Sequence, residues 1–310
     1  MVTTELKLKV VDRLKEVETT SGLNAKRFST RIGINQAQWS RLKSGDMESV
    51  ISDSRFISLA REYSVAMGQQ MEWKTVQTAT FVYISQLLET CQAQNISALL
   101  VDYSDLGKSH AAKHYSRNHS NAIYIDCSQV KSRQLFIREI AKNLGVNHTG
   151  KYSEVYKDLV FYMSSISNVI VILDEAGDLK YDAFLEIKAL WNATEGNAAF
   201  FMMGADGLKS LISRAINNKK VGFTEIFRRF GSQYRQVSPC IEEEIKKVKK
   251  GNNAPNVREA LDEFRREQVG LVARANAPAG TDIQKLVKAS RNSLTNLYNM
   301  IKVMNSKQAN

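Results

Sequence analysis

The chain has 310 residues, of which 43% are hydrophobic and 24% are charged. This composition is typical of a folded globular protein and excludes a largely disordered chain. The 43 Lys and Arg residues outnumber the 32 Asp and Glu residues, so the net charge of +11 favours a polyanionic partner, most often nucleic acid. The three cysteines are widely spaced, and the sequence has no signal-peptide core and no apolar run of about 18 residues; we therefore expect a cytoplasmic protein without membrane contact.

Residues 1–66 are predicted to form an all-α helix-turn-helix module. Apolar residues recur at helical spacing over 5–18, and a glycine-containing turn at 33–35 separates two short helices within 24–46. A further helix is predicted near 54–65. The second helix of the pair would be the recognition helix, and its candidate DNA-binding residues are Gln36, Gln38, Ser40, Arg41 and Lys43. The alternative is a protein-interaction module of the same fold, and in both cases Trp39 and Leu42 are expected in the core.

From residue 81 to 238 the pattern predicts an α/β core, after a linker at 67–80. Short apolar runs predict parallel strands covered on both faces, at 96–103, 121–127, 168–175 and 198–205. Helices are predicted between or after them, at 109–117, 131–144, 152–165 and 180–193. No strand is predicted after residue 207. Residues 239–310 are predicted to form a helical lid or C-terminal region, and helices are expected at 208–217, 240–250, 256–275 and 281–305.

A phosphate-binding loop is predicted between the first strand and the next helix, over Asp102–Ser109. Such a loop needs backbone N–H groups around phosphates, a lysine on the β/γ oxygens and a hydroxyl on Mg²⁺, which Lys108 and Ser109 would supply. Asp102 replaces the first glycine of the consensus. The candidate nucleotide-binding residues are Asp102, Tyr103, Ser104, Asp105, Leu106, Gly107, Lys108, Ser109 and His110. Taken alone, this loop could also be a surface turn with an ordinary lysine.

A second motif follows about 65 residues later, where the apolar strand 168–173 ends in Asp174 and Glu175. Asp174 can hold Mg²⁺ through water, and Glu175 can polarise the attacking water. Two carboxylates at the end of a buried strand would be costly without a ligand. Together with Lys108, they predict an ATP-binding site with Mg²⁺ as its metal.

Two further positions are candidates for contacts with the γ-phosphate. Asp206 follows the fourth strand, although Ala205 occupies the nearer position and a turn aspartate is common after a strand. Arg229, in preference to Arg228, is a candidate catalytic arginine that would reach the nucleotide of a neighbouring subunit. A solvated basic helix end is the alternative interpretation of these two arginines.

Basic residues near the helix starts of the core are candidates for non-specific DNA contacts, because phosphate contacts alone suffice for such binding. They are Lys113, Arg117, Lys131, Arg133 and Lys151. A solvated surface is again the alternative, since exposed lysines need no ligand.

The order of these motifs resembles the phage Mu transposition protein B family, whose members are DNA-binding AAA+ ATPases that serve a transposase. The resemblance is carried by the segments 39–42, 106–112, 172–179 and 203–204. It implies ATP-dependent assembly of a helical filament on double-stranded DNA, recruitment of a transposase and DNA-stimulated ATP hydrolysis.

The sequence departs from this family pattern at three positions. Asp102 replaces a glycine, Ala205 stands where asparagine is common, and Thr295 stands where these ATPases usually have a second sensor arginine. We therefore expect slow hydrolysis. The alternatives are a helicase loader or another mobile-element ATPase, and a helix-turn-helix transcription regulator with a degenerate nucleotide fold.

Overall fold

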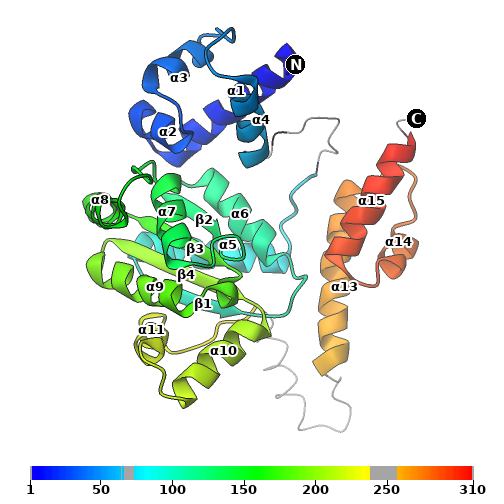
Figure 1. Ribbon diagram of the computed structural model, residues 1–310. Coiled ribbons are helices and arrows are strands. Elements are labelled where there is room, and N and C mark those ends of the chain that lie inside the picture. Colours follow the sequence, from blue (N-terminus) through cyan, green and yellow to red (C-terminus); the bar gives the residue numbers. More distant parts are fainter. Residues whose placement is uncertain (1, 64, 66–72, 238–256, 309–310) are drawn as a thin grey trace.

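The computed structural model describes residues 2–63, 65, 73–237 and 257–308 (Figure 1). The predicted helix at 240–250 and Cys240 lie outside these residues. Four N-terminal helices lie above an α/β core in Figure 1, and the C-terminal helices lie beside it. The four are α1 (Thr4–Ser21), α2 (Ala25–Arg31), α3 (Gln36–Lys43) and α4 (Asp53–Glu62).

The N-terminal helices pack around their own apolar residues. Phe28 and Trp39, whose ring centroids are 5.3 Å apart, have no exposed surface, and neither has Leu42, as expected from the sequence. Gly33 has a φ of 61° in the turn between α2 and α3, a left-handed conformation that glycine adopts without strain. Asn35 caps α3 and exchanges hydrogen bonds with Gln38 in a capping box. Local capping therefore fixes where α3 begins.

A parallel four-stranded sheet forms the centre of the core, so the predicted α/β fold class is confirmed. The strand order is β1-β4-β3-β2. The strands are β1 (Ala98–Val101), β2 (Ala122–Asp126), β3 (Val169–Asp174) and β4 (Ala198–Gly204). Successive side chains of β3 belong to different clusters, because Val171 and Leu173 pack on one face and Ile170 and Ile172 on the other. Both faces are covered, as continuous apolar runs require.

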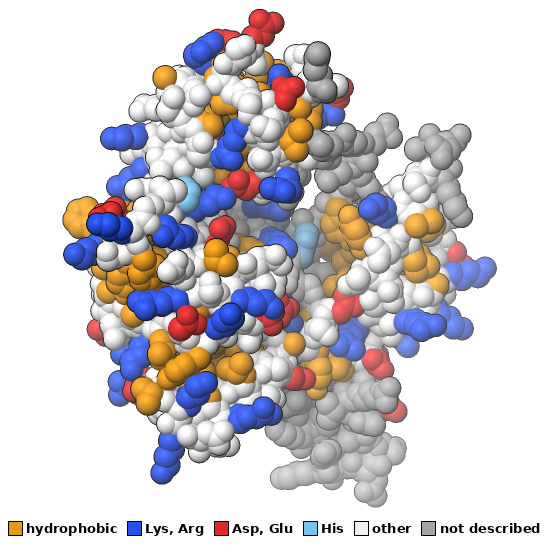
Figure 2. Space-filling view, viewed as in Figure 1, with side chains coloured by type: hydrophobic (Ala, Val, Ile, Leu, Met, Phe, Trp, Pro, Cys, Tyr) orange, Lys and Arg blue, Asp and Glu red, His pale blue; other side chains and the backbone are white. Residues whose placement is uncertain are grey.

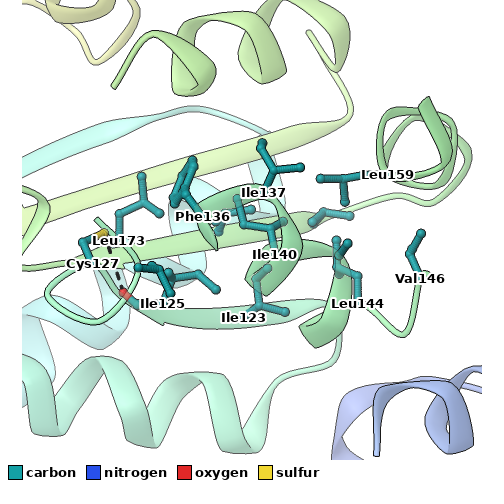
Figure 3. Packing of buried hydrophobic residues seen from close by; sticks show 14 of the residues in the cluster. Ile123, Ile125, Cys127, Phe136, Ile137, Ile140, Leu144, Val146, Leu159 and Leu173 are labelled. Carbon is teal, nitrogen blue, oxygen red and sulfur yellow. Dashed lines mark hydrogen bonds between the residues drawn. The ribbon is translucent and has the colours of Figure 1, made fainter. Parts of the chain in front are cut away.

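Helices cover the two faces of the sheet unequally. On one face lie α5 (Ala79–Gln94) and α6 (Lys108–Asn118). The other face carries a larger set, α7 (Arg133–Asn143), α8 (Tyr152–Ser165), α9 (Tyr181–Ala193), α10 (Asp206–Asn217) and α11 (Phe223–Arg229), with the short 3₁₀ helix η1 (Ala176–Asp178) after β3. Figure 3 shows Ile137 and Ile140 of α7 packed over Ile123 and Ile125 of β2, with Leu159 of α8 beside them.

One helix and one β-bridge of the core were not predicted from the sequence. Helix α5 was not predicted, because its apolar residues run consecutively over 81–84 and hide the helical spacing of Ile84, Leu88 and Cys91. The expectation of no strand after residue 207 is also incomplete. Arg235 forms an isolated parallel bridge beside β1. Arg235 N donates to Leu99 O at 2.8 Å, and Val101 N donates to Arg235 O at 2.9 Å.

The C-terminal helical unit consists of α13 (Val257–Asn276), α14 (Ile283–Ala289) and α15 (Leu294–Gln308). The prediction of one helix over 281–305 is wrong, because Arg291 and Asn292 have φ values of 55° and 56° and end the helical run. Trp73, from the predicted linker, packs on this unit with its ring 5.0 Å from that of Tyr298. Within the described ranges no helix is long and apolar enough to cross a membrane.

Candidate nucleotide-binding site

Three strand ends meet at one edge of the sheet and carry the predicted motifs. Val101 of β1 pairs with Gly204 of β4, and Leu173 of β3 pairs with Met202 of the same central strand. The loop after β1 and the carboxylates after β3 therefore flank the end of β4. Ligands of open parallel sheets bind in the crevice at the carboxyl ends of the strands.

Lys108 is the first residue of α6 and is 8% exposed. Its Nζ donates to the backbone oxygens of Asp102 at 3.0 Å and Tyr103 at 2.5 Å. Burial lowers the pKa of Lys108, and the nearby carboxylates of Asp102 and Asp174 oppose that effect. Gly107, with a φ of 85°, precedes α6 and supplies no side-chain cap, so the first N–H groups of the helix face the loop. A buried amine beside an uncapped helix start fits a phosphate ligand.

Asp102 turns its carboxylate away from the loop and into the protein. The side chain has no exposed surface, and it accepts hydrogen bonds from Tyr103 N at 2.8 Å and Val237 N at 2.6 Å. Its backbone is not left-handed, whereas Asp105 has a φ of 63°. The residue that replaces glycine therefore needs no glycine-like conformation. It fixes the segment after Arg235 to the first residue of the loop.

Asp174 and Glu175 lie across β4 from this loop. Asp174 is 3% exposed and accepts from Tyr124 Oη at 2.5 Å and from Glu175 N at 2.9 Å. Burial and the charge of Asp174 raise the pKa of Tyr124, so the phenol keeps its proton and donates it. Tyr124 was not predicted as a site residue. It pairs with Ile172 of β3, two residues before Asp174, and its place near the end of the predicted strand could have indicated a position close to this edge. The desolvation at this edge and the charge of Asp174 raise the pKa of Glu175.

A magnesium ion fits this donor set only together with a nucleotide. The described residues contain no group of three His, Cys, Asp or Glu side chains placed to hold a metal ion. Mg²⁺ in nucleotide enzymes is usually held by one or two carboxylates plus the phosphates and retains several waters. Ser109, in the first turn of α6, and Asp174, at the end of β3, are the protein ligands that this arrangement offers.

The C-terminal helical unit contacts the loop directly. Asp105 Oδ1 accepts from Thr295 N at 3.1 Å and from Thr295 Oγ1 at 2.8 Å. Arg265 Nη2 donates to Ser104 O at 3.3 Å. A Cβ placed on Gly107 would lie 3.5 Å from Leu294, so α15 begins immediately above the loop. The unit is therefore positioned to respond to whatever the loop binds.

The remaining predicted nucleotide contacts lie at the rim of the site. His110 forms a hydrogen bond of 3.2 Å with Thr75 Oγ1, and burial followed by nearby positive charge lowers its pKa. Leu106 is buried in the loop, with 1% of its surface exposed. Asp206 is exposed in the first turn of α10, and Ala205 lines a small hollow with Glu175.

The two candidate catalytic arginines of α11, Arg228 and Arg229, have different surroundings. The guanidinium of Arg229 lies 4.8 Å from the ring centre of Trp191, and its Nη2 donates to Asn192 Oδ1. Arg228 is exposed on the same short helix. Arg229 is thus held on α9 of its own chain, whereas Arg228 is available to a neighbour.

The recognition-helix candidates separate into exposed and engaged side chains. Gln36 and Ser40 are exposed on α3. Gln38 donates to Val50 O at 3.0 Å in addition to its capping contact. Arg41 is exposed but paired with Asp46 at 2.8 Å, and Lys43 is paired with Glu18 at 3.0 Å.

The basic candidates of the core fall into two groups. Lys113 and Arg117 line a cleft of about 1140 Å³ between the N-terminal helices and the core, opposite Arg13 of α1. Lys131 and Arg133 lie at or just before the start of α7 and form ion pairs with Asp178 at 2.9 Å and Glu186 at 2.5 Å, respectively, and exposed Lys151 precedes α8. In Figure 2 the Lys and Arg side chains are distributed over all three parts of the visible face.

The parallel sheet and the loop at its edge form an α/β core of the P-loop type, and residues 98–212 match the family described as an AAA domain. A curated relative, the Mu-like prophage FluMu DNA transposition protein B of Haemophilus influenzae, is 22% identical over 201 residues, which are 64% of this chain and 69% of the relative. This similarity agrees with the resemblance drawn from the motifs. The solved structure of the Aeropyrum pernix Orc1 protein in complex with DNA is 17% identical, with a TM-score of 0.36 over 76% of this chain and 79% of that chain.

Proposed function

We propose that this protein is an ATP-dependent DNA-binding ATPase that assembles as a filament on double-stranded DNA and delivers that DNA to a transposase. The observation that carries the ATP part is that Lys108, in the loop region after β1, and Asp174, at the end of β3, lie on either side of the end of β4 in an AAA domain. The similarity to a relative named a DNA transposition protein supports the transposition part. The net charge of +11 supports a polyanionic partner.

The side chains at the strand ends have distinct roles in this proposal. Lys108 exchanges its two carbonyl partners for β/γ-phosphate oxygens, and Ser109 and Asp174 would hold a Mg²⁺ ion, which would supply charge neutralisation at the phosphates. Tyr124 fixes one oxygen of Asp174. Glu175 orients and deprotonates the attacking water, for which its raised pKa is favourable.

Slow turnover and a role as an assembly switch are the second part of the proposal. Ala205 presents no polar group at the end of β4, and Thr295 presents a hydroxyl in place of a cation. Both omissions leave the developing charge of the transition state less stabilised. Meanwhile, Asp105 and Ser104 connect the loop to α15 and α13, so binding is transmitted to the C-terminal helical unit even when hydrolysis is slow.

DNA contacts are proposed at two places. The exposed side chains of α3, Gln36, Ser40 and Arg41, would meet one surface of the duplex. The cleft beside α6, with Lys113 and Arg117, would take phosphates, and Lys131, Arg133 and Lys151 form the second basic group. Binding that rests on such phosphate contacts weakens as salt increases.

Electron microscopy of the full chain on random-sequence duplex DNA tests this function. We expect filaments with ATP and Mg²⁺, and none with ADP or with the Lys108→Ala variant. Assembly by Lys108→Ala equal to wild type would refute nucleotide control. ATP-independent binding to a single operator sequence would instead indicate the transcription regulator.

A strand-transfer assay with a purified Mu-like transposase separates the proposed role from a helicase loader. The protein is expected to raise strand transfer into DNA on which it has assembled, in the presence of ATP. Stimulation of helicase loading without any effect on strand transfer would favour the alternative.

A further inference from the structure

A second cation of the C-terminal helical unit lies against the phosphate-binding loop. In the described part of the chain, Lys108 and Arg265 are the two basic side chains that donate hydrogen bonds to the backbone of this loop. Lys108 holds the carbonyl oxygens of residues 102 and 103, and Arg265 holds that of Ser104. The two cations therefore contact consecutive residues, 102–104, at the start of the loop. The lysine of a P-loop contacts the β- and γ-phosphates, so we place the terminal phosphate close to these residues.

The guanidinium of Arg265 has unused donors. A guanidinium carries five N–H groups, and the bond to Ser104 uses one of them. The Nε of Arg265 is buried and has no hydrogen-bond partner. The guanidinium carbon also lies 5.9 Å from the centre of the Tyr103 ring. A planar fork of donors in this position matches the oxygens of a phosphate.

A second polar group on the same face of α13 also lacks a partner. Gln268 is 3% exposed, and neither its Nε2 nor its Oε1 has a hydrogen bond. It lies one turn beyond Phe264 and Arg265, and Phe264 packs against the cluster that contains Ile84 and Tyr115 of the core. An amide buried without partners is costly, and such a group in a native protein calls for an explanation such as a ligand.

The negative charges around Lys108 also favour a second cation at the loop. Asp102, Asp174, Glu175 and Asp206 all act on Lys108. A nucleoside triphosphate brings further negative charge to a site in which carboxylates already outnumber the one lysine. Arg265 supplies positive charge from α13, next to the carbonyl groups that Lys108 contacts.

We propose that Arg265 is a nucleotide-binding residue that contacts the terminal phosphate of ATP, with the amide of Gln268 beside it, and thereby makes the site prefer ATP to ADP. Arg265 thereby supplies from α13 the positive charge that Thr295, at the start of α15, does not carry. This inference rests on the proposed function, because it requires that the loop bind ATP. It also couples the C-terminal helical unit to the presence of the terminal phosphate.

Titration calorimetry of the full chain with ATP and with ADP, each with Mg²⁺, tests this proposal. Arg265→Gln is expected to weaken ATP binding about 10- to 100-fold, the value of a hydrogen bond to a charged group, and ADP binding by less than about three-fold. Arg266→Gln is the matched control, because its side chain is exposed on the same helix, and it should change neither affinity. An ATP preference that survives in Arg265→Gln would overturn the inference.

Two further measurements separate this inference from a folding defect and from failure of the proposed function. Gln268→Leu should raise the unfolding temperature without nucleotide, because it removes an unsatisfied amide, and still weaken ATP binding. Unchanged ATP affinity in Gln268→Leu would show that Gln268 does not contribute to ATP binding. If the wild-type protein binds neither nucleotide, the proposed function fails; if it binds ATP and Arg265→Gln retains the same preference, only the inference fails.

Discussion

The carboxylate of Asp105 in the phosphate-binding loop accepts both the backbone N–H and the hydroxyl of Thr295, at 3.1 and 2.8 Å. Thr295 lies in the first turn of α15, where N–H groups lack partners within the helix. Asp105, a residue of the phosphate-binding loop, therefore caps the start of α15 in the C-terminal helical unit. In the proposed function the phosphates bind in the same loop as this carboxylate, so we expect the capping contact and nucleotide binding to be energetically linked.

Two variants of Asp105 separate its hydrogen bonds from its charge. Asp105→Ala should lower the stability of α15 by about 0.5–2 kcal/mol, as loss of a helix cap does, and speed hydrogen exchange at residues 294–298. Asp105→Asn keeps an acceptor and removes the charge, so it should bind ATP more tightly than wild type. Weaker ATP binding by Asp105→Asn would show that the negative charge does not oppose the phosphates.

Restoring the consensus glycine at position 102 is expected to damage the protein. Asp102→Gly would leave Tyr103 N–H and Val237 N–H without their buried acceptor, at about 1–3 kcal/mol for each unsatisfied group. Thermal unfolding and steady-state ATPase assays check this expectation. A variant of unchanged stability that hydrolyses ATP faster would instead show that Asp102 is a simple brake on catalysis.

Glu175→Gln tests the assignment of the water-activating residue. Loss of a positioned general base typically costs about 10²–10⁴-fold in rate, whereas ATP binding should remain within a few-fold of wild type. Filaments of Glu175→Gln on DNA are accordingly expected to persist in ATP. Asp174→Asn is the comparison variant, and it should lose Mg²⁺-dependent ATP binding as well. Unchanged turnover in Glu175→Gln would require another base.

The neighbouring arginines of α11, Arg228 and Arg229, offer a matched test of which one is the catalytic arginine that reaches the nucleotide of a neighbouring subunit. Arg229→Ala should destabilise the fold, because it removes the contacts with Trp191 and Asn192. Arg228→Ala should leave stability unchanged and lower only the ATPase rate of assembled protein, measured on DNA at concentrations that support filaments. If Arg229→Ala keeps its stability and loses assembly-dependent hydrolysis, the catalytic arginine is Arg229, as predicted from the sequence.

The sequence predicted the sheet and the centre of the site because both leave local patterns. Buried parallel strands are continuous apolar runs; Asp174 ends one of them, and the loop that leads to Lys108 follows another. The partners of these residues could not be predicted in the same way. Asp102 meets Val237, Asp105 meets Thr295 and Arg265 meets Ser104 across 135, 190 and 161 residues of sequence.

The missed elements have similarly physical causes. Helix α5 packs on the sheet with an apolar surface too broad for a clear period, so only its tertiary contacts reveal it. The break between α14 and α15 depends on left-handed conformations at Arg291 and Asn292, for which arginine gives no signal. On α3, Gln38 was predicted to contact DNA bases. Its side-chain amide instead takes part in the capping box and donates a hydrogen bond to Val50 O.

Direct measurement of ATP binding by the wild-type chain and by Lys108→Ala is the most decisive test of the nucleotide site. With Mg²⁺ present, calorimetry should detect one ATP per wild-type chain and no binding by Lys108→Ala, whose unfolding should remain cooperative. Equal affinity in the two proteins, or no binding by the wild type, would contradict the central claim that this strand edge is an ATP site.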